Sequence, residues 1–445
     1  MTARTKAGAD GGTRAEAVPA LDTDALIDDP DIRIIVCCGS GGVGKTTTAA
    51  ALGVRAAERG RKVVVLTIDP ARRLAQSMGI DSLDNVPRRV KGIEGDGELH
   101  AMMLDMKRTF DEIVEAHADA ERARAILENP FYQSLSAGFA GTQEYMAMEK
   151  LGQLRAREEW DLIVVDTPPS RSALDFLDAP KRLGSFLDGK FIKLLMAPAK
   201  MGGRAGMKFL NVGMSMMTGT LGKLLGGQFL RDVQTFVAAM DTMFGGFRTR
   251  ADATYKLLQA PGTAFLVVAT PERDALREAA YFVERLAAEN MPLAGLVLNR
   301  VHGSEAARLS AEQAMTAAEN LEAENLENGG IVDQAAGKAG LREPADSPAA
   351  GHAPTTDATG TAPPEAEAAR RPVTTEELTA GLLRLHAERM QMVAREQDTR
   401  DRFTARHPEV AVTAVAALPG DVHDLSGLRT IGDRLATGSA PAGAA

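Results

Sequence analysis

Short, continuously apolar runs recur along this chain and are separated by longer segments of mixed polarity. Runs without internal alternation predict strands buried on both faces, as in a parallel sheet. They lie at 32–36, 62–68, 160–166, 263–269, 293–298 and 410–418. Amphipathic or small-residue segments between them predict helices, so we expect an α/β fold with a doubly wound, mostly parallel sheet.

The expected helices occupy 46–60, 107–128, 143–158, 274–289, 374–406 and 425–435. The first ends at a glycine, Gly60, which is the commonest helix terminator. The fifth begins with Thr374-Thr375-Glu376-Glu377, a capping-box sequence. Residues 81–100 predict a loop and a short strand.

Two segments interrupt the alternation. Residues 191–247 contain eight of the 19 methionines, with many glycines between them, and predict a methionine-rich helical insertion over 191–255. Residues 303–371 lack Phe, Trp and Tyr and are rich in Ala, Glu, Gly, Pro and Thr. Such a composition cannot bury enough apolar surface to order itself, which predicts a mostly disordered insertion. Within it, a solvated helix is expected over 304–327, stopped by Gly329-Gly330.

A glycine-rich loop joins the first strand to the first helix. Its phosphate-binding candidates are Gly39, Ser40, Gly41, Gly42, Val43, Gly44, Lys45, Thr46 and Thr47. Glycines leave backbone N–H groups free to face phosphate oxygens, and the helix N-terminus adds partial positive charge. Lys45 would reach the β- and γ-phosphates, and the Thr46 hydroxyl would bind Mg²⁺. A glycine turn with a surface lysine is the alternative, and the strand–loop–helix context disfavours it.

Two carboxylates follow apolar strands. Asp166 is the candidate for binding Mg²⁺ or its water shell, the alternative being a turn or helix-capping residue. Asp69 is the candidate for polarising the attacking water and a further metal ligand, the alternative being a turn former before Pro70. Both would lie at the carboxyl ends of parallel strands, where α/β sheets bind ligands.

The loop Gly39–Thr46 resembles the deviant Walker A loop of the MinD/ParA/ArsA group of dimeric ATPases. Asp69-Pro70-Ala71 is similar to switch I of the arsenite-pump and tail-anchored-protein targeting ATPases, and Asp166-Thr167-Pro168-Pro169-Ser170 to their switch II. Leu296–Val301 and Thr270-Pro271-Glu272, with Glu278, also match that family. The similarity covers about 31–302 and 374–435.

This resemblance implies P-loop NTPase topology with ATP and Mg²⁺ as cofactors. It implies that Lys45 and Asp69 are catalytic, that Asp166 supports Mg²⁺, and that Asn299 and Pro419 contact adenine. The implied organisation is an N-terminal tail, an ATPase domain in three parts, two insertions and a C-terminal tail. Their expected boundaries are 1–30, 31–190, 191–255, 256–302, 303–371, 372–435 and 436–445.

The sequence departs from the family pattern at several motif positions. Ser40 stands where the signature lysine is expected, Arg72 and Arg73 replace switch I residues, and Arg171 and Ser172 replace switch II residues. Three interpretations of Ser40 stay open. In the first, an arginine of the switch motifs replaces the positive charge of the missing lysine. In the second, a related ATPase that has the lysine pairs with this chain in a heterodimer. In the third, the chain is simply a slow ATPase. The family's zinc-binding and arsenic-binding cysteines are missing, which disfavours arsenite transport.

Composition excludes several other classes of protein. A formal net charge of −9 and an aromatic content of 4% disfavour nucleic-acid binding. No apolar run reaches the roughly 18 residues of a membrane span, and the polar N-terminus is no secretory signal. The adjacent Cys37 and Cys38 can form neither a mutual disulfide nor a four-ligand zinc site. A cytoplasmic location is therefore expected.

We therefore expect a Mg²⁺-dependent ATPase that acts as a homodimeric or heterodimeric switch. The methionine-rich segment would bind a hydrophobic protein client, because methionine-rich surfaces accept varied apolar partners. Ordinary core packing of a helical subdomain is an equal alternative for that segment. Alternatives for the whole chain are a weakly catalytic regulatory subunit of a heterodimer and a MinD/ParA-type positioning ATPase.

Overall fold

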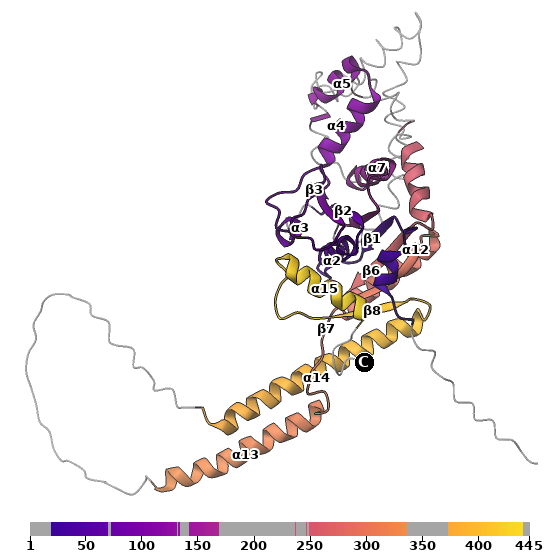
Figure 1. The fold of residues 1–445 in the computed structure, drawn as a ribbon. Helices are drawn as coiled ribbons and strands as arrows, with labels where there is room; N and C mark the ends of the chain where they lie inside the picture. The colour runs from indigo at the N-terminus through magenta and orange to yellow at the C-terminus, as the bar shows by residue number, and fades with distance from the viewer. Residues whose placement is uncertain are drawn as a thin grey trace, which may run out of the picture. The chain divides into compact units, whose positions relative to one another are not determined.

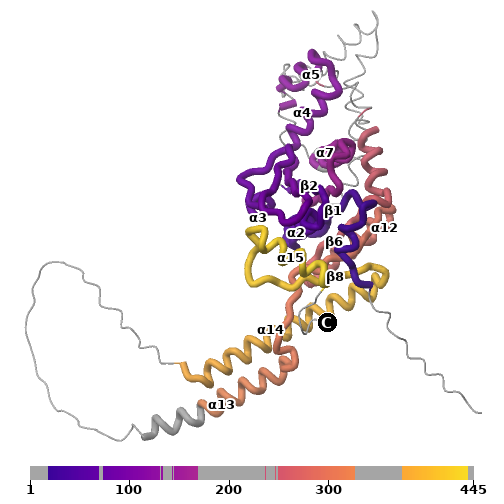
Figure 2. Tube along the Cα trace, viewed as in Figure 1, coloured from indigo at the N-terminus to yellow at the C-terminus, as the bar shows by residue number. Residues whose placement is uncertain are grey.

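The computed structural model describes residues 19–69, 73–130, 132–133, 142–168, 236, 246, 249–335 and 373–438. These residues divide into two compact units. The larger unit contains the described residues up to His302 and from Glu396 onward, and the smaller unit contains Gly303–Arg395. Figures 1 and 2 trace the chain through both.

An eight-stranded sheet organises the larger unit, in the order β3-β4-β2-β5-β1-β6-β7-β8. Every neighbouring pair is parallel except β3 with β4. The strands are β1 (Ile34–Cys38), β2 (Lys62–Thr67), β3 (Arg88–Arg89), β4 (Glu98–Met103), β5 (Leu162–Asp166), β6 (Thr263–Ala269), β7 (Leu293–Val301) and β8 (Val412–Ala416). The expected α/β fold with a mostly parallel sheet is confirmed.

Helices connect and cover these strands (Figure 1). They are α1 (Thr23–Asp28), α2 (Lys45–Glu58), α3 (Arg73–Ser77), α4 (Met106–His117), α5 (Ala120–Leu127), α7 (Thr142–Ala156), α12 (Arg273–Ala288), α13 (Ala311–Ala335), α14 (Thr375–Arg406) and α15 (Leu425–Thr437). Most lie within a few residues of the segments that periodicity predicts.

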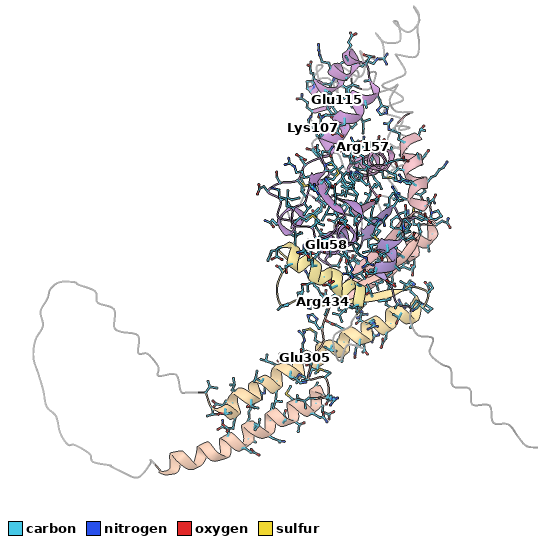
Figure 3. The ribbon with its side chains drawn as sticks, in the orientation of Figure 1. Glu58, Lys107, Glu115, Arg157, Glu305 and Arg434 are labelled. Carbon is cyan, nitrogen blue, oxygen red and sulfur yellow. The ribbon has the colours of Figure 1, made fainter. Side chains whose placement is uncertain are left out.

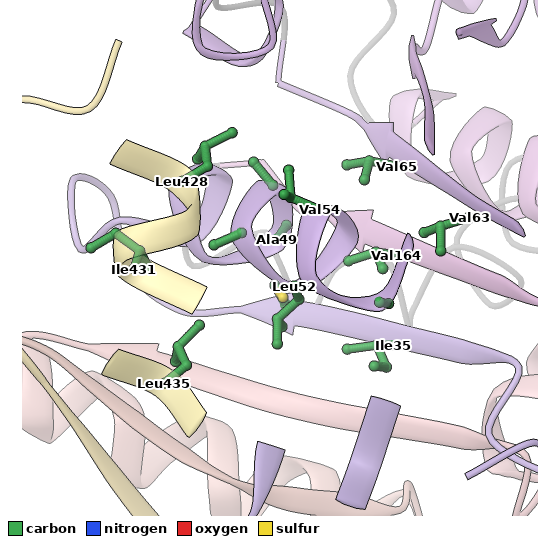
Figure 4. Packing of buried hydrophobic residues seen from close by; sticks show 14 of the residues in the cluster. Ile35, Ala49, Leu52, Val54, Val63, Val65, Val164, Leu428, Ile431 and Leu435 are labelled. Carbon is green, nitrogen blue, oxygen red and sulfur yellow. The ribbon is translucent and has the colours of Figure 1, made fainter. Parts of the chain in front are cut away.

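The core that α2 covers shows why this helix is rich in small residues. Leu52 and Val54 of α2 are fully buried, and α15 packs against the same helix through Leu428 and Leu435 (Figure 4). A Cβ atom on Gly53 would come 2.5 Å from a methyl group of Val65 in β2. The helix therefore lies too close to the sheet for a larger residue at that position.

Polar contacts hold the C-terminal helix α15 onto the sheet and α2. Glu58, at the end of α2, accepts a hydrogen bond of 2.8 Å from the Nε of Arg429. Arg434 donates a hydrogen bond of 2.7 Å to the carbonyl of Ala416, at the end of β8. Figure 3 marks Glu58 and Arg434. The last segment of the chain thus completes the larger unit.

The N-terminal segment corrects one expectation. A flexible tail over 1–30 is wrong for residues 19–30, because Ala20 pairs with Val412 of β8 and the next residues form α1. Asp22 caps that helix by accepting from the backbone of Ala25. Asp24 of α1 pairs with Arg55 of α2, so the segment is fixed to the larger unit.

Two helix boundaries also differ from expectation, and side-chain capping explains both. The helix expected over 107–128 is two helices, because Asp119 caps a new one by accepting from the backbone of Arg122. The helix expected from 304 begins at Ala311, where Ser310 and Gln313 cap each other reciprocally. It continues past Gly329-Gly330 to Ala335. Glycine inside a helix costs only about 1 kcal/mol, which the other residues offset.

The smaller unit consists of α13 and the first part of α14, which run side by side as a hairpin (Figures 1 and 2). Small residues of both helices are buried, among them Ala318 and Ala387. Arg384 pairs with Glu322 at 2.5 Å across the hairpin. The buried alanines thus lie inside the hairpin, whereas the ion pair is exposed to solvent.

Candidate active site

The loop after β1 has the backbone geometry that its glycines predict. Gly39, Gly42 and Gly44 all have positive φ angles, of 148°, 79° and 96°. A Cβ atom on Gly39 would lie 2.1 Å from the carbonyl oxygen of Val268, in β6. The loop therefore passes so close to the sheet that only glycine fits there.

Lys45 begins α2 and is folded back into the loop. Its ammonium donates a hydrogen bond of 2.8 Å to the carbonyl of Ser40, and its side chain is almost fully buried. Burial lowers the pKa of Lys45, while the negative charges of Asp166 and Asp69 act in the opposite direction. The loop thus holds one cation against its own backbone, where the lysine of a phosphate loop is expected.

Asp166 ends β5 and lies between β1, which leads into the loop, and β2. In register it faces Cys37 of β1 on one side and Thr67 of β2 on the other. Its Oδ2 accepts hydrogen bonds from the hydroxyls of Thr46 (2.7 Å) and Thr67 (2.9 Å). Its Oδ1 is buried and has no hydrogen-bond partner among the described residues.

The environment of Asp166 raises its pKa to about 6. Burial is the main cause, and the neighbouring charge of Asp69 acts in the same direction. The hydrogen bonds from Thr46 and Thr67 and the charge of Lys45 oppose it. An unpartnered buried carboxylate oxygen favours a cation beside it.

These groups fit a magnesium ion held jointly by protein and nucleotide. Mg²⁺ usually binds one or two protein oxygens and completes its shell with water and phosphate oxygens. Thr46 and Asp166 offer such oxygens next to the cradle. In the part of the chain that the structure describes, no group of three or more His, Cys, Asp or Glu side chains is arranged so that it could hold a metal ion by itself.

Asp69 follows β2 and lies near the same group of charges. Its backbone N–H donates to the Thr67 hydroxyl at 3.2 Å. Gln143 of α7 donates to the preceding carbonyl, that of Ile68, at 2.9 Å. The charge of Asp69 influences the pKa values of both Lys45 and Asp166, so the three groups are neighbours.

Asn299, near the end of β7, contacts the loop itself. Its Nδ2 donates to the carbonyl of Val43 at 2.9 Å, and its Oδ1 accepts from the backbone of Arg300 at 2.9 Å. A Cβ atom on Gly44 would lie 2.2 Å from that Nδ2. The buried asparagine therefore braces the phosphate loop. Pro419 is exposed, three residues after β8.

A model of the protein family described as anion-transporting ATPases matches residues 32–328, well over half of the chain. The chain belongs to this family. The expected ArsA-type relationship is thereby confirmed, and with it an ATP-binding ATPase. The match stops before 374–435, but β8 of that segment pairs with β7 and extends the same sheet.

Curated relatives agree with the family assignment. ATPase GET3 of Podospora anserina is 26% identical over 283 residues, which cover 62% of this chain and 75% of the relative. ATPase get3 of Aspergillus terreus is 25% identical over 305 residues, covering 67% and 82%. ATPase GET3 of Malassezia globosa is 30% identical over 158 residues, covering 36% of this chain and 45% of that relative. The last alignment therefore spans less than half of the Malassezia protein.

A cavity of about 320 Å³ borders the phosphate loop of this ATPase. Ser40 lines it together with the carboxylate residues Glu272 and Glu278 and with Arg300. Arg300 is exposed and has a φ of 59°, a left-handed conformation uncommon for arginine. An arginine thus lies in the same cavity as the serine that replaces the signature lysine.

Sequence reasoning missed three residues of this site. Thr67 holds Asp166, Gln143 holds the segment before Asp69, and Arg300 shares the cavity with Ser40. Thr67 had a usable signal, since it is the one polar residue inside the apolar run 63–68. The roles of Gln143 and Arg300 depend on which elements meet in space, which periodicity does not reveal.

Some expected features lie outside the described residues. They include Pro70 to Arg72, Pro169 to Ser172 and almost all of the methionine-rich segment 191–255. Among the residues that are described, no helix is both long enough and apolar enough to cross a membrane.

Proposed function

We propose that this protein hydrolyses ATP with Mg²⁺ at the phosphate loop and acts as a dimeric switch. The observation that carries the proposal is the Asp166 carboxylate, which accepts from Thr46 through one oxygen and has its other oxygen buried without a partner in the described structure. That arrangement suits a cation at the start of α2, beside the backbone amides of the loop.

Each residue has a distinct task in this proposal. Residues Gly39–Thr47 surround the phosphates, and Lys45 neutralises charge on the β- and γ-phosphates. Thr46 and Asp166 hold Mg²⁺, which when bound withdraws charge from the phosphate oxygens. Asp69 orients and polarises the attacking water. Asn299 positions the loop through Val43, and a contact of Asn299 and Pro419 with adenine belongs to the same proposal.

The substitution Asp69→Asn tests the catalytic part. We expect nucleotide affinity to stay within about twofold and turnover to fall roughly 100-fold or more, the usual contribution of a positioned acid–base group. Fluorescent-nucleotide binding and phosphate release measure the two quantities. Asp81→Asn, in an exposed loop, is the matched control and should change neither. Unchanged turnover in Asp69→Asn would remove Asp69 from the mechanism.

We also propose that the second protomer is either a copy of this chain or a related ATPase. Ser40 lacks the cation expected at its position, and Arg300 lies in the same cavity. If Arg300 supplies the positive charge that the signature lysine would bring, a homodimer has all the charges that hydrolysis needs. If it does not, a partner with the signature lysine supplies the charge, and this chain alone is a weakly catalytic subunit.

Native mass spectrometry of the protein isolated from its host, with Mg²⁺ and a non-hydrolysable ATP analogue, separates these cases. A nucleotide-bound homodimer would support compensation, and Arg300→Gln should then lower turnover. A heterodimer with a second ATPase would support the regulatory role. Ser40→Lys tests whether the position matters at all: equal turnover alone and with the partner would make the missing lysine irrelevant.

The proposed output of the switch is binding and release of a hydrophobic protein client at segment 191–255. Its support is the methionine content of that segment and the similarity to the tail-anchored targeting ATPases. A photocrosslinker at Met216 or Met217 should capture an apolar segment in host extract, and capture of nothing would contradict the idea. A cytoplasmic location is part of this proposal, because the switch consumes ATP and the cytoplasm contains it.

A further inference from the structure

A groove of about 340 Å³ lies between α12 and the C-terminal end of α14. Four arginines line it: Arg273 and Arg277 from α12, and Arg402 and Arg406 from α14. All four are exposed and belong to the larger unit. The whole chain carries a net charge of −9, so this concentration of positive charge is local.

The spacing of these arginines is unfavourable unless an anion is present. On each helix the two arginines are four residues apart, which places like charges on one face. Arg273 is also the first residue of α12, where the helix dipole disfavours a cation. On α14 the helix dipole partly offsets this repulsion, because Arg406 lies in the last turn of that helix. The placement is therefore unfavourable mainly on α12, which argues for a role of these arginines in binding.

Among the described residues, carboxylates pair with only two of the four arginines. Arg277 pairs with Asp274 at 3.1 Å, and Arg402 with Asp398 at 4.0 Å, but both pairs are largely exposed. Arg273 and Arg406 have no ion pair among the described residues. Exposed pairs of this kind are weak and exchange readily for a better anion.

The bottom of the groove is formed by buried and largely apolar side chains. Leu276 of α12 and Phe403 of α14 are both buried, and the ring of His407 packs on that of Phe403 with centroids 5.0 Å apart. An apolar floor with polar groups around it is typical of a small-molecule site. The volume lies at the lower end of the range for such sites, about 300–1,000 Å³.

We propose that this groove binds a compact organic ligand that carries at least two phosphate groups. Guanidinium groups bind phosphate oxygens in pairs with good geometry. Carboxylates bring one charge each, whereas a phosphate brings up to two, so a small volume facing four arginines favours phosphates. The apolar part of the ligand would lie on Leu276 and Phe403.

This site is separate from the ATP site, although α12 borders both. The cavity at the phosphate loop is lined by Glu272, Asp274 and Glu278 of the same helix, and it shares no lining residue with the groove. One face of α12 is thus acidic toward the loop and the other is basic toward α14. Binding in the groove can therefore be measured independently of ATP hydrolysis.

The test is isothermal titration calorimetry of the full-length chain with pyrophosphate and with tripolyphosphate, without Mg²⁺. All proteins carry Lys45→Ala to weaken anion binding at the phosphate loop. The groove variant is Arg277→Gln/Arg402→Gln. Its control is Arg122→Gln/Arg400→Gln, which removes the same charge from residues that do not line the groove. Circular dichroism checks that each variant is folded.

We expect the groove variant to bind tripolyphosphate roughly 30-fold more weakly than its parent, as the loss of two charge-assisted contacts implies, and the control to bind equally well. Equal affinity in both variants, or no binding by the parent, would overturn the proposal. Flotation with phosphatidylglycerol vesicles is a further arm. Flotation that the groove variant loses, without tripolyphosphate binding by the parent, would assign the groove to a membrane surface instead.

Discussion

At the scale of single residues, Gly44 couples the phosphate loop to β7. Its φ is 96°, and a Cβ atom there would lie 2.2 Å from the Nδ2 of Asn299. We expect Gly44→Ala to weaken ATP binding at least roughly tenfold, because either the loop or Asn299 must move. Gly60→Ala is the control: its φ is 95°, yet nothing lies within 4 Å of the new methyl group. Gly60→Ala should lose about 1 kcal/mol of stability and Gly44→Ala at least as much, but only Gly44→Ala should lose affinity, as nucleotide titration would show.

The contrast between Asp166 and Asn299 shows which residue roles a sequence reveals. Asp166 ends an apolar strand beside the loop, and parallel strands bring their ends to one edge, so its placement follows from local pattern alone. Asn299 also lies near the end of a strand, but its contact with Val43 depends on the left-handed turn at Gly44 and on the order β1-β6-β7. Such three-dimensional contacts have no period in the sequence.

At the scale of elements, α1 depends on ion pairs with α2. The pKa of Asp24 is lowered mainly by its hydrogen bonds with Arg55, one of which is 2.7 Å long. A lowered folded-state pKa gives stability that is present above the unfolded value of 3.8 and is lost as the pH falls through the folded value. We expect Asp24→Asn to lower the free energy of unfolding by about 1 kcal/mol near pH 7 and by much less near pH 3, as measured by urea unfolding.

The control is Asp398→Asn, which is largely exposed and should change the free energy of unfolding by less than about 0.5 kcal/mol at either pH. A loss that is independent of pH would contradict the ion-pair explanation.

The same helix marks the limit of prediction for elements. Residues 19–30 look like a polar tail because their order depends on partners far along the chain, Val412 and Arg55. The strands, by contrast, carry their own signal, since a buried parallel strand must be apolar throughout. The helix predicted to end at Gly60 ends two residues earlier, at Glu58. The starts of two helices were not predicted, because the capping side chains of Asp119 and Ser310 decide them.

At the scale of the whole molecule, the smaller unit is an insertion in the larger unit, between His302 and Glu396. These two residues of the larger unit contact each other. The backbone N–H of His302 donates to Glu396 at 2.9 Å, and the His302 Nδ1 lies 2.5 Å from the other oxygen of that carboxylate. The two ends of the larger unit are therefore within side-chain reach of each other. Replacing 304–394 with about five Gly and Ser residues should close this gap without strain. We expect the shortened chain to fold and to bind ATP within about threefold of the full-length affinity, because every described residue of the site lies outside the smaller unit. His302→Ala in the full-length chain is the control for the junction itself. If the shortened chain loses ATP binding while His302→Ala keeps it, ATP binding requires the smaller unit. The claim that the larger unit alone binds ATP would then be wrong.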